Sequence, residues 1–86
     1  MTELNYTIKS KEGLHARPAA RLVKLAGSFK GKIEISYQKT VNMKSMLLVL
    51  SLGIPHGAQF KITLDGELES EMANSIQQVL EEEALI

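Results

Sequence analysis

The stretch KGKIEISYQKTVNMKSMLLVLSLGIPHGAQFKITLDG, residues 30–66, decides the fold, because its hydrophobic periodicity changes along its length. Apolar and polar residues alternate over 33–37, which is typical of a half-buried strand, and residues 39–42 can add a short strand after a tight turn. The apolar run 45–52 is predicted to form a helix that stops at the glycine and proline after it. Alternation resumes over 58–64. The stretch therefore predicts the order strand, strand, helix, strand.

The flanking segments complete this pattern. Residues 4–9 alternate like a strand, while 16–27 and 72–80 repeat their apolar residues at helical spacing. The order becomes β-α-β-β-α-β-α, and every strand is apolar on one side only. We expect an α/β (α+β) two-layer sandwich of the split-βαβ kind, with a mainly antiparallel four-stranded sheet and helices on one face. A chain of 86 residues supports one core, so residues 1–86 are predicted to form a single domain.

Composition excludes several classes of protein. The chain has no cysteine, which excludes disulfide scaffolds and thiolate metal sites, and His56 in its turn has no second ligand nearby. We therefore expect no metal and no cofactor. No apolar run reaches the roughly 18 residues that span a bilayer, and no signal-like segment opens the chain, so we expect a cytoplasmic protein without membrane insertion. A zero net charge and few aromatic residues argue against nucleic-acid binding.

The zero net charge hides an asymmetry. Residues 9–44 carry nine of the ten basic side chains, whereas 61–86 carry one lysine against seven acids. A basic surface suits an acidic partner or a phosphorylated group. The run Glu81, Glu82 and Glu83 is interpreted as the solvated end of the last helix.

The segment Gly13-Leu14-His15-Ala16-Arg17-Pro18 marks the change from strand to helix. Pro18 suits the first helical turn, whose free N–H groups and partial positive charge attract anions. There His15 is favoured as a neutral nucleophile that can accept a phosphoryl group, and Arg17 can hold two phosphate oxygens. Gly13 gives the loop conformational freedom, and Glu12 is the one acid expected nearby. The alternative is a surface histidine at a helix cap beside a solubilising arginine.

Ser45 directly precedes the apolar run, where a helix cap is preferred. The simple interpretation is a capping serine. The functional interpretation is a regulatory phosphorylation site, at which phosphate would gain from the helix terminus and from Lys44.

The helix predicted after Ser45 has too many apolar residues for one face. Its core side can take Val49 and Leu52, so some of Met46, Leu47, Leu48 and Leu50, here called the 46–50 patch, must face solvent. A fully buried helix is the alternative, but a domain this small has no second layer to cover it. An exposed patch of this kind indicates a protein-binding surface.

GLHARPAA at 13–20 and VNMKSMLLVLSLGIPHGAQ at 41–59 resemble HPr, the histidine-containing phosphocarrier proteins of the bacterial phosphoenolpyruvate-dependent sugar phosphotransferase system. The resemblance extends over nearly the whole chain. It implies an open-faced β-sandwich and a phosphocarrier, which is a protein substrate and not an enzyme. His15 matches the residue that takes phosphate from phospho-Enzyme I on Nδ1 and passes it to an enzyme IIA, and Arg17 matches the residue that contacts this phosphate.

The resemblance also implies regulation. Ser45 matches the serine modified by HPr kinase/phosphorylase, which makes family members corepressors of catabolite control protein A, and the 46–50 patch matches the surface used for Enzyme I. Family members often have a small or polar residue where this chain has Leu48. A regulatory paralogue of the catabolite-control or nitrogen-related branch, acting through the 46–50 patch, is therefore the alternative function. An RNA-binding or small-ligand domain is a third class, which the few aromatic residues argue against.

Overall fold

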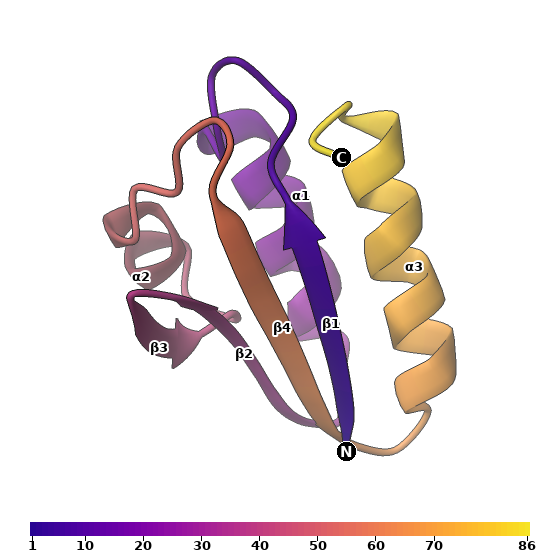
Figure 1. The fold of residues 1–86 in the computed structure, drawn as a ribbon. Coiled ribbons are helices and arrows are strands. Elements are labelled where there is room, and N and C mark those ends of the chain that lie inside the picture. Colours follow the sequence, from indigo (N-terminus) through magenta and orange to yellow (C-terminus); the bar gives the residue numbers. More distant parts are fainter.

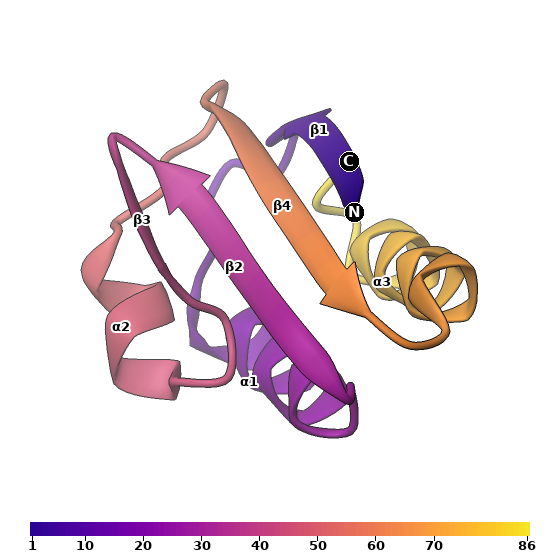
Figure 2. The ribbon, with the colours of Figure 1, turned by 90° about the horizontal axis from the view of Figure 1, so that it is seen from below.

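Four strands form a single antiparallel sheet in the order β1-β4-β2-β3 in the computed structural model, which describes all residues 1–86. The strands are β1 (Thr2–Thr7), β2 (Gly31–Tyr37), β3 (Lys39–Asn42) and β4 (Gln59–Gly66), and the helices are α1 (Ala16–Gly27), α2 (Met46–Ser51) and α3 (Glu69–Glu82). All three strand pairs are antiparallel. The predicted fold class and element order are confirmed, and α1 and α3 lie side by side on one face of the sheet (Figures 1 and 2).

Alternation along the strands builds the core. The inward residues of β2 and β4 are buried, whereas their neighbours in sequence are more exposed. Leu22 and Ala26 of α1 and Ile76 and Leu80 of α3 pack against them with no exposed surface. Together, 21 buried hydrophobic residues form one cluster. None of the helices combines the length and the apolar character that spanning a bilayer requires.

Three segments distant in sequence meet at one end of the sheet (Figure 1). The loop after β1 is tied to the loop before β4 by the Leu14 N–H, which donates to the Ile54 carbonyl at 2.9 Å. It is also tied to the chain beyond α3, because the Lys9 N–H donates to the Leu85 carbonyl. This end of the molecule therefore holds the start of α1 against the end of α3.

The boundaries differ from the sequence pattern at the ends of the elements. β1 begins at Thr2, before the predicted start at residue 4, because Thr2 pairs with Leu64 of β4. α3 begins at Glu69, one turn before the periodic residues 72–80. Strand pairing extends β1, and a first turn without apolar residues extends α3, beyond the apolar pattern of each element. The local pattern alone therefore does not fix these boundaries.

Candidate functional site

His15 is the N-cap of α1, where the extended backbone of the loop turns into the helix. Its side chain is half-buried and makes no capping bond. The first turn contains no acidic residue, and its leading N–H groups have no partner within the helix. Pro18 lies in this first turn, as predicted, and is buried. A partial positive charge and free donors therefore lie next to an imidazole, which is an arrangement that suits an anion.

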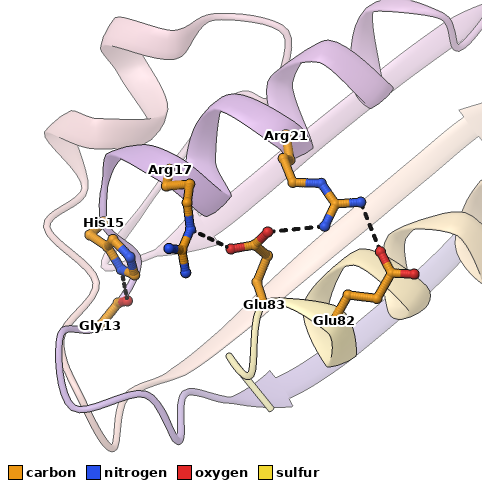
Figure 3. A network of polar contacts seen from close by, with 6 residues as sticks. All are labelled: Gly13, His15, Arg17, Arg21, Glu82 and Glu83. Atoms are coloured by element: carbon orange, nitrogen blue, oxygen red, sulfur yellow. Dashed lines mark hydrogen bonds and ion pairs between the residues drawn. The ribbon is translucent and has the colours of Figure 1, made fainter.

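The orientation of the imidazole is set by the loop. Its Nδ1 lies 3.2 Å from the carbonyl oxygen of Gly13 (Figure 3). A carbonyl oxygen only accepts hydrogen bonds, so this bond forms when the ring carries a proton on Nδ1. A transfer to Nδ1, as the resemblance implies, therefore requires this hydrogen bond to break and the proton to move to Nε2.

Arg17 lies two residues beyond His15 and engages an acid that the sequence analysis did not place there. Its Nε donates to Oε1 of Glu83 at 2.9 Å. The expectation that Glu12 is the one acid near this segment is wrong. Residues 17 and 83 are far apart in the chain, and the packing of α1 beside α3 brings them together.

The expectation of a solvated acidic end for α3 is also wrong for Glu83. Its side chain is 11% exposed, and its second oxygen accepts from Nη1 of Arg21 at 3.0 Å. The Nη2 of Arg21 donates to Glu82 at 2.8 Å (Figure 3). Two arginines from the basic part of the chain thus pair with two glutamates from its acidic part, at the end of the molecule that holds His15. Arg17 and Arg21, four residues apart and so on one helix face, were the available sequence signal.

These ion pairs have an electrostatic consequence. Hydrogen bonds from Arg21, and then from Arg17, lower the pKa of Glu83 below its ordinary value of 4.5, and Arg21 likewise lowers the pKa of Glu82. Both groups are therefore carboxylates at neutral pH.

This lowering predicts a loss of stability in acid. Since the folded-state pKa of Glu83 lies below the unfolded one, its contribution is present above about pH 4.5 and is lost as the pH falls through the folded value. We expect the free energy of unfolding, measured by urea denaturation, to decrease below pH 4.5, and to decrease less steeply in Glu83→Gln. Glu69, whose pKa is lowered by hydrogen bonds from Thr2 and Gly66, keeps part of the slope. Equal slopes in the two proteins would contradict the assignment.

Ser45 is the N-cap of α2, as predicted, and its Oγ accepts from the Leu48 N–H at 3.2 Å. In the unmodified protein the Lys44 Nζ donates to the carbonyl of Phe29 at 2.9 Å. The serine is half-buried. The Ser45 hydroxyl therefore caps α2, and phosphorylation would modify this same oxygen.

The 46–50 patch is exposed only in part. Leu47 is 79% exposed, while Leu48 and Leu50 are near 40%. Met46 is half-buried and packs against the core, so it contributes less to the exposed surface than Leu47 does. Val49 and Leu52 are buried, as predicted. Leu47, Leu48 and Leu50 are therefore the members of the patch that face solvent.

The structure contains no group of three or more His, Cys, Asp or Glu side chains placed to hold a metal ion. The His56 Nδ1 lies 3.1 Å from the carbonyl of Ser10. This exposed contact joins the turn before β4 to the loop after β1.

Comparison with known proteins gives a consistent result. The family model described as PTS HPr component phosphorylation site matches residues 2–82. The structure is similar to the histidine-containing phosphocarrier protein of Mycoplasma, with 35% identity, a TM-score of 0.94, and coverage of 99% of this chain and 98% of that one. It is similar to phosphocarrier protein HPr from Bacillus anthracis, with 34% identity, a TM-score of 0.80, and coverage of 91% and 94%.

A regulatory relative matches as well. The Bacillus subtilis catabolite repression protein Crh has 31% identity and a TM-score of 0.71, with coverage of 100% of both chains, and was described as an intertwined, domain-swapped dimer.

Proposed function

This chain belongs to the HPr family of phosphocarrier proteins of the phosphotransferase system, and we propose that His15 is the residue on which it carries phosphate. Members of this family are phosphorylated intermediates and not catalytic enzymes. In the proposal, His15 accepts from phospho-Enzyme I and donates to a sugar-specific enzyme IIA. The observation that carries it is the half-buried imidazole at the start of α1, with Arg17 in the same turn and no acid in that turn.

The transfer balances without an added co-reactant. The bond between phosphorus and its donor atom in phospho-Enzyme I breaks as a bond from phosphorus to a His15 ring nitrogen forms. The donor atom recovers its electron pair, and the His15 ring keeps one N–H and gains positive charge. The α1 N–H groups and Arg17 would offset the charge on the phosphoryl oxygens, which is how oriented donors favour such transfers.

The test is intact-mass spectrometry of the protein after incubation with Enzyme I, phosphoenolpyruvate and Mg²⁺. We expect one phosphoryl adduct, which mild acid removes because phosphohistidine is acid-labile. Absence of an adduct from the folded protein, in the presence of an active control carrier, would contradict the proposal.

Residues 1–86 would act as one domain, since a single cluster of buried side chains spans α1, the sheet and α3. The protein would work in the cytoplasm, where its phosphoenolpyruvate-dependent donor operates. It would use no metal or cofactor of its own, since the transferred group arrives bound to a partner.

A second function, regulation through Ser45, is supported by its place at the start of the helix that carries the exposed Leu47. Phosphate on this cap would add about two negative charges next to the 46–50 patch. An HPr kinase/phosphorylase would be the modifying enzyme and catabolite control protein A the partner of the modified form. The similarity to Crh favours this role as a paralogue function.

We predict that Ser45→Asp and Ser45→Ala separate the cap from the charge. Alanine removes the acceptor of the Leu48 N–H and should cost about 1 kcal/mol of stability, whereas aspartate keeps a cap and adds charge. Isothermal titration with Enzyme I should give an affinity about tenfold lower for Ser45→Asp, a change of roughly 1.4 kcal/mol, and an unchanged affinity for Ser45→Ala. Equal binding by both variants would count against regulation at this site.

A further inference from the structure

Arg17 is mostly in water but is not free. Its side chain is 73% exposed, and its Nε donates to Oε1 of Glu83, whose side chain is 11% exposed. The two Nη groups of Arg17 make no ion pair. The group expected to clamp a phosphoryl group on His15 is thus held by one atom to a nearly buried carboxylate.

Glu83 has two arginine partners, one for each oxygen. Arg17 contacts Oε1 at 2.9 Å, and Arg21 contacts Oε2 at 3.0 Å (Figure 3). Arg21 is itself held by Glu82 at 2.8 Å. If Arg17 leaves, Glu83 keeps a cation. If Arg21 were missing, the departure of Arg17 would leave Glu83 with no cation, so Arg17 would leave less readily.

On the premise that the proposed function is correct, we infer that Arg17 exchanges one anion for another during transfer. Glu83 holds Arg17 while His15 is unmodified, and Arg17 moves to the phosphoryl group when His15 carries it. Arg21 is the positioning residue that allows the exchange, because it continues to neutralise Glu83. Arg21 therefore acts through Glu83 and not on the phosphate.

The exchange is directed by the two anions. A phosphoryl group carries up to two negative charges and three acceptor oxygens, and a guanidinium can bind such a group with two donors. The bond to Glu83 uses Nε alone. The phosphoryl group can therefore form more hydrogen bonds with Arg17 than Glu83 does. The bond to Glu83 must break first, which reduces the net free energy gained. This competition sets how strongly phosphate is retained on His15.

The test measures the phosphorylated fraction with Enzyme I at a fixed ratio of phosphoenolpyruvate to pyruvate. Glu83→Gln frees Arg17 and should raise the ratio of phosphorylated to unmodified protein about two- to fivefold, the range for a partly exposed ion pair. Arg21→Gln leaves Glu83 dependent on Arg17 and should lower this ratio by a similar factor. Glu82→Gln is the matched control, since it makes the same charge change but contacts Arg21 and Gln78 and not Arg17, and it should have little effect.

The double variant Arg21→Gln/Glu83→Gln separates the inference from a general charge effect. Simple addition of charges predicts that the two changes cancel and restore the wild-type ratio. The exchange predicts the ratio of Glu83→Gln alone, because without Glu83 there is nothing for Arg21 to neutralise. A return to the wild-type ratio would overturn the inference.

A second readout follows Arg17 directly. The Nε–H signal of Arg17 in ¹⁵N NMR should shift when the wild-type protein is phosphorylated, and in Glu83→Gln it should already lack the carboxylate-bound position before phosphorylation. The spectra also report whether each variant is folded. If wild type is phosphorylated but the Arg17 signal does not move and Glu83→Gln matches Glu82→Gln, the inference fails alone. If wild type takes no phosphate from Enzyme I, the proposed function and the inference fail together.

Discussion

Replacing His15 by alanine is expected to reduce phosphoryl acceptance from phospho-Enzyme I to background while leaving the fold intact. No other nucleophile lies at the start of α1, where the helix N–H groups and Arg17 meet. The side chain of His15 is half-buried and makes no cap bond, so its loss should change the free energy of unfolding by less than about 1 kcal/mol. Intact-mass spectrometry gives the first quantity and urea denaturation the second.

His56→Ala is the matched control, because His56 is the chain's other histidine and is exposed. It should be phosphorylated as fully as wild type, since His56 contacts the carbonyl of Ser10 and not the start of a helix. Arg17→Ala should still accept phosphate but more slowly. An adduct of undiminished size on His15→Ala would place the phosphate elsewhere and defeat the proposal.

The fold could be predicted because each strand has one apolar side. The alternation in 33–37 and 58–64 is a local property that the sheet then uses, and β2 and β4 bury the predicted faces. The start of α1 was equally local, since Pro18 and the change of period both mark it. The pairing of residues distant in the chain could not be predicted from the sequence. Whether β1 begins at Thr2 depends on Leu64, which is distant in the chain.

The residues of the candidate site also separate into those that the local sequence predicts and those that depend on tertiary packing. His15 and Arg17 lie at the start of one helix, and Ser45 caps another, so all three positions could be proposed from the local sequence. Glu83 could not be identified without the packing of α1 against α3, because an acidic run after an amphipathic helix is most often solvated. Only 11% of its side chain is exposed, because two arginines from the N-terminal part of the chain pack against it. Charge asymmetry between the halves indicated complementarity but not which residues pair.

Gly13→Ala is expected to have the second large effect, by disturbing the loop that carries His15. Gly13 has a φ of +67°, and an added Cβ would lie against the Ile54 carbonyl oxygen and 3.0 Å from Cα of Pro55. That carbonyl accepts from the Leu14 N–H, so moving it also weakens this bond. Left-handed strain, crowding and the weakened bond should together cost about 2–4 kcal/mol of stability.

Gly53→Ala separates strain from crowding, because Gly53 has a φ of +59° but nothing within 4 Å of an added Cβ. It should cost only about 1–2 kcal/mol, the strain contribution alone. The excess in Gly13→Ala measures how tightly the loop before His15 rests on the loop before β4. A displacement of His15 by about 1 Å can slow a transfer up to about a hundredfold, so Gly13→Ala should also accept phosphate more slowly where both variants are folded. Equal stability losses and equal rates in the two variants would mean that the contact with Ile54 does not position the histidine.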